Sequence, residues 1–185
     1  MQERKQIANI NNSTNNSTNS STDAVEQIIQ QWQAQGFADE QLTAMQTIGR
    51  IKRLEVLLMR QLTITYKAHQ LTQWEFDVLA TLRRAGEPFI LSPTALFASM
   101  MVTSGTMTNR LQHLQEKALI QRIENPEDKR SLLVQLTDKG VAVIDKVVVA
   151  HIELENQLLS AMSQEELTIL NTLLKKVEAN LPKSE

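Results

Sequence analysis

Apolar residues recur every three or four positions along most of the chain, which is the period of an amphipathic helix. The two longest such patterns predict helices over residues 40–68 and 137–159. Most of the shorter patterns open with a Ser, Thr or Asp at a capping position. These shorter patterns predict helices over 23–35, 72–84, 92–99, 103–117 and from 163 onward.

The apolar stripes of the two long helices are larger than a small core needs. We therefore expect them to pack against a second copy of the chain. The first stripe consists of Ile48, Ile51, Leu54, Leu58 and Leu62, and the second of Ile144, Val147, Val148, His151, Leu154 and Leu158.

The period changes between residues 119 and 136. Short strands are predicted over 119–124 and 132–136, and the polar loop 125–131 between them predicts a β-hairpin. Two short helices joined by a tight turn and followed by such a hairpin form a winged helix-turn-helix. The predicted fold is mainly α with a small β-wing (α+β), a winged helix-turn-helix with long dimerisation helices.

Composition divides the chain further. Residues 11–22 read NNSTNNSTNSST, and a stretch without apolar side chains cannot offset its ordering entropy by burial. The predicted regions are a disordered polar tail (1–22), an extra N-terminal helix (23–36), a helical dimerisation region (40–70 and 138–182) and a winged helix-turn-helix domain (71–137).

Composition also excludes several classes of protein. The 185 residues contain no Cys, which excludes disulfides, thiolate metal sites and cysteine nucleophiles. No apolar run approaches the length of a membrane span, and the N-terminus lacks the apolar segment of a secretion signal. We expect a cytoplasmic protein with no membrane partner.

The net charge of −2 and the pI of about 6.0 argue mildly against nucleic-acid binding, because such domains usually carry a basic excess. The distribution of charge changes this picture. Basic residues outnumber acidic ones from Ala44 to His69 and again from Thr103 to Ile123. A nearly neutral chain can therefore present local basic surface.

Catalytic and metal-binding motifs are missing from the sequence. It contains no Gly-rich phosphate loop and no G-x-S-x-G, and the spacing of His69, His113 and His151 fits no metal site. We predict neither an enzyme nor a metal or organic cofactor, and we expect His151 in a dimer core. A helical adaptor that binds only protein is the alternative of another class, but such a protein would need no hairpin.

The helix predicted over 103–117 has an apolar back and a polar front. At 100° per residue, Met107, Leu111, Leu114 and Ala118 share the core side, and Gly105, Asn109 and Gln112 point the opposite way. Small residues at the start of the helix permit close approach to a duplex, and Asn109 could read adenine. A solvated polar face is the alternative. The candidate DNA-contacting residues in this helix are Thr103, Ser104, Gly105, Thr108, Asn109, Gln112 and His113.

The loop of the hairpin supplies the other candidate DNA contacts, Asp128, Lys129 and Arg130. Arg130 at the tip suits a narrow minor groove, and Asp128 could brace it. A solvated salt bridge within the turn is the alternative.

Two charged residues lie at the edges of apolar helix faces. Arg110 stands about 70° from the centre of the core side of its helix, and Asp77 flanks the apolar side of the helix over 72–84. Charges that are half-buried need partners. The simpler interpretation is an Asp77–Arg110 salt bridge that holds the recognition helix.

Three motifs in this order resemble the MarR family of dimeric winged-helix regulators. The resemblance implies a homodimer that binds a pseudo-palindromic operator, most often as a repressor, and it runs from Glu40 onward. The motifs are VTSGTMTNRL (102–111), NPEDKRS (125–131), which contains the family's D-x-R wing signature at Asp128 and Arg130, and LTDKG (136–140).

A finer resemblance is to the urate-responsive branch of this family that includes PecS and HucR. That branch has a Trp on an extra N-terminal helix, an Asp, and two Arg residues. Trp32, Asp77, Arg110 and Arg122 match all four. The resemblance implies a urate or related purine effector held by paired Arg donors, with Asp77 accepting a ring N–H and Trp32 stacking. Another aromatic or phenolic anion is the main alternative, and a ligand-independent repressor is the third.

Overall fold

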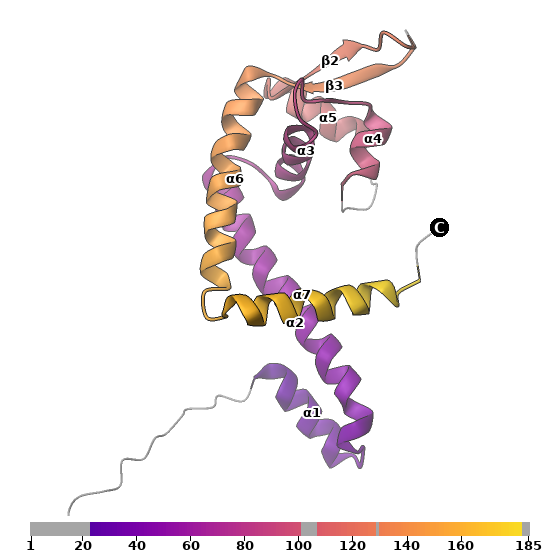
Figure 1. Cartoon of the computed structure of the whole chain (residues 1–185), viewed down its shortest axis with the longest axis vertical. Helices are drawn as coiled ribbons and strands as arrows, with labels where there is room; N and C mark the ends of the chain where they lie inside the picture. The colour runs from indigo at the N-terminus through magenta and orange to yellow at the C-terminus, as the bar shows by residue number, and fades with distance from the viewer. Residues whose placement is uncertain (1–22, 101–106, 129, 183–185) are drawn as a thin grey trace, which may run out of the picture. The chain divides into compact units, whose positions relative to one another are not determined.

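The computed structural model of the chain describes residues 23–100, 107–128 and 130–182 (Figure 1). The chain forms two compact units, one ending at Glu55 and the other beginning at Val56. Helix α2 (Asp39–Ala68) contributes residues to both units. The tail predicted to be disordered, residues 1–22, lies outside the described residues, as does the predicted start of a helix at 103–104.

The first unit contains α1 (Ala24–Ala34) and the first half of α2. Asp23 caps α1 as predicted, because its Oδ1 accepts from the backbone N–H groups of Val25 and Glu26 at 2.8 Å. Its other carboxylate oxygen lies 2.9 Å from the guanidinium of Arg50. The small core of this unit consists of Val25, Ile29 and Leu42.

The second unit is a compact helical domain that carries a small sheet. Its first elements after α2 are α3 (Gln73–Arg84), β1 (Ile90–Leu91) and α4 (Pro93–Ala98). They are followed by α5 (Met107–Glu116), β2 (Ile120–Glu124), β3 (Leu132–Leu136), α6 (Asp138–Leu158) and α7 (Gln164–Ala179).

Local side-chain caps fix where these helices begin. The hydroxyls of Ser92, Thr137 and Ser163 each accept from the backbone N–H three residues later, at 3.0–3.2 Å. Each cap satisfies an amide that the first turn of a helix leaves unpaired. The three predicted helix starts are confirmed for this reason.

The sheet has three antiparallel strands in the order β1-β3-β2. The hairpin of β2 and β3 is confirmed, with Ile120 opposite Leu136 and Glu124 opposite Leu132. Strand β1 is absent from the sequence prediction. It pairs only through Ile90 with Gln135 and Leu91 with Val134, and two residues are too few to show a strand period.

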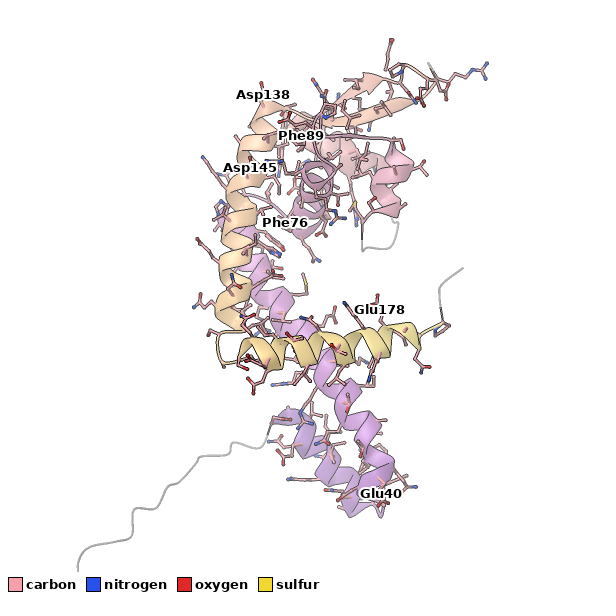
Figure 2. All side chains as sticks on the ribbon, in the orientation of Figure 1. Glu40, Phe76, Phe89, Asp138, Asp145 and Glu178 are labelled. Carbon is pink, nitrogen blue, oxygen red and sulfur yellow. The ribbon has the colours of Figure 1, made fainter. Side chains whose placement is uncertain are left out.

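Helix α3 lies at the centre of the core of the second unit. Val78, Leu79 and Leu82 of α3 are fully buried, together with Leu114 of α5 and Ile144 of α6. Figure 2 labels two residues at its edge, Asp145 and Phe89. The Nε of Arg83 donates to Asp145 at 2.7 Å, and its guanidinium lies 4.7 Å from the centre of the Phe89 ring.

Gly140 allows the start of α6 to approach the link between α5 and β2. A Cβ at this position would overlap the backbone carbonyl oxygen of Leu119. The link is held from the same side, because Thr137 Oγ1 donates to the carbonyl of Ala118 at 2.8 Å. The LTDKG motif therefore joins a helix cap to a close backbone contact.

One expectation about a single residue is wrong. Ala118 was predicted on the core side of the recognition helix, but α5 ends at Glu116 and Ala118 is exposed with φ of 55°. Leu119 is buried in its place. His151 contacts its own chain, with Nδ1 3.1 Å from the hydroxyl of Tyr66, and its position in a dimer core stays a prediction.

Helix α7 has no buried residue although its sequence is amphipathic. Apolar side chains of α7, together with Leu181 two residues beyond its end, form an exposed row, which we call the α7 row: Leu170, Leu173, Leu174, Val177 and Leu181. None of the helices in the described ranges combines the length and apolar character that crossing a membrane requires.

Candidate nucleic-acid interface and ligand pocket

Helix α5 has the predicted division between an apolar back and a polar front. Leu111 and Leu114 are buried in the core, while Asn109 and Gln112 are exposed. Gln112 Nε2 donates to Glu116 Oε1 at 3.1 Å, one turn further along the same face. The exposed amides present hydrogen-bonding groups of the kind that read base edges, and their contact with DNA stays a prediction.

The structure does not describe several of the residues predicted to contact DNA. Thr103, Ser104, Gly105 and Lys129 lie outside the described residues. Thr108 belongs to α5, but its side chain is not described.

His113, predicted beside the polar front, turns partly toward α3. Its Nε2 lies 3.6 Å from Glu75 Oε1, and its ring centre lies 6.1 Å from that of Trp74. The side chain is still 52% exposed. His113 therefore stands between the exposed face of α5 and the first turn of α3.

Arg110 also contacts the first turn of α3. Its guanidinium carbon lies 5.7 Å from the centre of the Trp74 ring, a cation–π distance, and the residue is half-buried. The predicted boundary position of Arg110 is confirmed. The predicted salt bridge with Asp77 is wrong, since no ion pair joins these two described residues and Arg110 lies over Trp74 instead.

The wing loop is organised by its own side chains. Asp128 Oδ1 accepts from the backbone N–H of Arg130 at 3.0 Å, and Asn125 Nδ2 donates to the hydroxyl of Ser131 at 2.9 Å. Asp128 thus braces the backbone of Arg130. The side chain of Arg130 is exposed, as a residue that enters a groove must be.

Asp77 lines a pocket of about 270 Å³ in the second unit. Burial raises the pKa of its carboxyl, and the charges of His151 and Arg84 oppose that rise. Phe76, labelled in Figure 2, stacks on Tyr66 with ring centres 4.5 Å apart. The pocket is lined by Met59, Leu62, Tyr66, Gln73, Phe76, Asp77, Thr81, Met100 and His151.

The four predicted ligand residues occupy different places. Asp77 lines the pocket, whereas Arg110 and Arg122 do not. Arg122 is half-buried on β2, opposite Val134. Trp32 belongs to the first unit, where it is 40% exposed and meets Phe37 edge-on. That all four form one site stays a prediction.

Sequence reasoning missed the importance of Glu75. The prediction used it only as the partner of Thr72 in a capping box, and this role is confirmed because Glu75 Oε2 accepts from the Thr72 backbone N–H at 2.7 Å. Glu75 stands three, four and seven residues before Val78, Leu79 and Leu82, so the sequence places a carboxylate on an apolar stripe. This pattern could have indicated a buried charge. No group of His, Asp or Glu within the described ranges could hold a metal ion.

Known proteins share this sequence and fold. Residues 69–131 match the sequence pattern of the MarR family. The HTH-type transcriptional regulator PecS of Dickeya dadantii (strain 3937) is 39% identical over 157 residues, which cover 85% of this chain and 94% of that protein. PecS is named as a transcriptional regulator, not as an enzyme.

Two solved structures are similar over three quarters of the chain. A MarR-like transcription regulator from Bacillus cereus ATCC 10987 has a TM-score of 0.68 and 25% identity, over 76% of this chain and 99% of that one. A mutant MarR from E. coli, complexed with operator DNA, has a TM-score of 0.64 and 29% identity, over 76% of this chain and 98% of that one. The predicted mainly helical fold with a small β-wing is confirmed, and the chain belongs to the MarR family of transcriptional regulators.

Proposed function

We propose that the protein is a homodimeric, ligand-responsive repressor that binds double-stranded DNA. The observation that carries this proposal is the exposed polar front of α5, with Asn109 and Gln112 set on buried Leu111 and Leu114. The adjoining hairpin bears exposed Arg130 at its tip. The E. coli relative in complex with operator DNA supports the same role.

In this proposal α5 enters the major groove and Arg130 enters the minor groove beside it. Asn109 can pair with adenine through two hydrogen bonds, and an Arg side chain is attracted to a narrow A·T-rich groove. Two copies would read half-sites about 34 Å apart, one turn of the duplex.

A second copy also explains the α7 row. An amphipathic helix with no buried residue gains nothing from its apolar side within one chain. Packing the α7 row against another protomer removes that surface from water and sets the spacing of the two α5 helices.

The DNA-binding role can be tested with a random-sequence pool, which requires no chosen operator. The wild-type protein is used to enrich duplexes from the pool, and the affinity for the enriched duplex is measured against salt concentration. We expect a pseudo-palindrome, and an affinity that falls steeply with salt because phosphate contacts release counterions.

Arg130→Ala tests the wing. We expect a loss of affinity of at least about ten-fold for the enriched duplex, because one groove contact is removed. Thermal melting should be unchanged, since the side chain is exposed. Lys175→Ala, which removes one exposed positive charge from α7, is the matched control and should change affinity little. Unchanged affinity in Arg130→Ala would contradict the wing contact.

For the effector we propose urate or a related purine. Four identities match the urate-responsive branch, and Asp77 lies half-buried beside a pocket of about 270 Å³. Arg110 is half-buried, with its guanidinium carbon 5.7 Å from the centre of the Trp74 ring. A weakly acidic oxopurine offers ring N–H groups to the carboxylate and oxygens to guanidinium donors.

A phenolic or other aromatic anion is the second candidate. The wall of the Asp77 pocket favours it, because Tyr66, Phe76 and His151 provide aromatic surface there, whereas Arg110 and Arg122 do not line that space.

A thermal shift assay separates the two candidates. A ligand that binds only the native protein raises the melting temperature with its concentration. We expect urate to exceed xanthine, hypoxanthine and salicylate, and we expect Arg110→Ala and Asp77→Ala to lose the shift. Arg130→Ala should keep the full shift although it loses DNA affinity. A response to salicylate alone would replace the purine with a phenolic effector, and no response would contradict both.

A further inference from the structure

Glu75 is a charged residue on the buried side of α3 that the proposed DNA contacts and the ligand pocket leave unused. Its side chain is 0% exposed. A buried carboxylate loses its hydration, and this loss costs free energy unless partners replace the water. An apolar residue would fill the same space without that cost, so the charge must be explained by the contacts that it makes.

These contacts join the start of α3 to the end of α5. Glu75 Oε1 accepts from Lys117 Nζ at 2.5 Å, and its other oxygen accepts from the backbone N–H of Thr72 at 2.7 Å. Lys117 Nζ also donates to the carbonyl of Gln70 at 3.3 Å. In turn, the carbonyl of Lys117 accepts from Lys139 Nζ at 2.8 Å. The residue that follows α5 is therefore held from three sides.

The same turn of α3 contacts α5 along its length. Arg110, His113 and Lys117 stand at i, i+3 and i+7, so they share one side of α5. Arg110 lies over Trp74, His113 lies between Trp74 and Glu75, and Lys117 pairs with Glu75. This side adjoins the one that buries Leu111 and Leu114.

We propose that Glu75 is a positioning residue for DNA recognition, which fixes the rotation and the axial position of α5 through Lys117. This inference rests on the proposed DNA-binding function. Leu111 and Leu114 attach α5 to the core, but apolar contacts tolerate small rotations because they have little directional preference. The hydrogen bond from Lys117 to this carboxylate, which the Thr72 amide also holds, is charge-assisted and depends on direction. The contact thereby sets the direction in which the polar front of α5 faces the DNA.

The test measures specificity, which is the ratio of the affinity for the enriched duplex to the affinity for a scrambled duplex of the same length. Glu75→Gln keeps the size of the side chain and an acceptor for Thr72 but removes the charge that holds Lys117. We expect the ratio to fall by at least about ten-fold, the loss of roughly one base contact. Affinity for the scrambled duplex should not fall, because phosphate contacts do not depend on the rotation of α5.

The direction in which the affinity for each duplex changes distinguishes a positioning role of Glu75 from an electrostatic one. Removing a negative charge from a DNA-binding protein strengthens its general attraction to phosphate. A purely electrostatic role for Glu75 would therefore give tighter binding to both duplexes, and such a result would overturn the inference. Glu153→Gln is the matched control, because Glu153 is an exposed acidic residue of α6 outside the candidate DNA contacts, and it should leave the ratio unchanged.

A second variant protects the test against misfolding. If Glu75→Gln does not melt cooperatively, the double variant Glu75→Gln/Lys117→Gln takes its place, because it leaves neither charge without its partner. Its ratio should be as low as that expected for Glu75→Gln, since both residues act through one contact.

The outcomes distinguish this inference from the proposed function. A wild-type protein that enriches no duplex would overturn both. A wild-type protein that enriches a duplex, with variants that keep its full specificity, would overturn the role of Glu75 alone.

Discussion

Two carboxylates on α3 show how local surroundings decide the chemistry of a single residue. Burial acts to raise the pKa of Glu75, but hydrogen bonds from Lys117 and Thr72 outweigh it and the pKa is lowered. Asp77, two residues later, is also partly buried, and the pKa of its carboxyl is raised. The difference follows from the partners, since Glu75 has an ammonium at 2.5 Å whereas Asp77 has no ion pair among the described residues. A charge held for structure is thus paired, and a charge available to a ligand is not.

The raised pKa of Asp77 leads to a prediction about stability. A carboxyl with a raised pKa binds its proton more tightly in the folded protein than in the unfolded one, so its ionised form destabilises the fold above that pKa. Asp77→Asn should therefore raise the melting temperature of the unliganded protein at pH 7. The gain should shrink as the pH falls toward the ordinary value of 3.8, where the wild-type group becomes neutral as well.

Thermal melts at a series of pH values, at one protein concentration, measure this effect. Asp145→Asn is the comparison, because it removes the exposed partner of Arg83 and should lower the melting temperature slightly or leave it unchanged. A lower melting temperature for Asp77→Asn at pH 7 would show that Asp77 stabilises the unliganded protein, contrary to this prediction.

At the scale of the elements, the parts that local sequence specifies were predictable. Hydroxyl caps mark the starts of α4, α6 and α7, and the contrast of Asn109 with Leu111 marks the two sides of α5. These features depend on side chains within one turn of each other, so the chain itself displays them.

Elements that depend on distant partners were not predictable. Strand β1 exists because Ile90 and Leu91 meet β3, which lies more than forty residues further along. The end of α5 is set by Ala118 in a left-handed conformation, which helical periodicity does not encode. Glu75 was visible as half of a capping box, but its bond to Lys117 joins residues that are 42 positions apart. The candidate ligand site was identified by residue identity alone, and the aromatic wall of the Asp77 pocket became apparent only from the fold.

At the scale of the whole molecule, the α7 row predicts how two copies associate. Leu173 is 52% exposed in the centre of the row. Burying a Leu side chain at an interface contributes about 1.5–3 kcal/mol, and a charge in its place adds a desolvation cost. Leu173→Glu should therefore raise the dimer dissociation constant at least about ten-fold and weaken binding to the pseudo-palindrome to match.

Sedimentation over a range of protein concentrations measures this shift. Lys175→Glu lies two residues away, outside the α7 row, and changes charge without altering apolar surface, so it should leave the dimer intact. An unchanged sedimentation profile for Leu173→Glu would place the contact between copies elsewhere on the chain.

The way in which the wing is attached has a consequence for how this protein can diversify. Strand β1 pairs with β3 only at Val134 and Gln135, where the wing joins the domain, while hydrogen bonds within the wing loop join Asn125 to Ser131 and Asp128 to Arg130. Residue pairs can therefore be added or lost between Glu124 and Leu132 without disturbing the buried Leu136 or the cap at Thr137. The length of the wing and the stability of the domain are therefore separate traits. Selection can act on one while leaving the other unchanged.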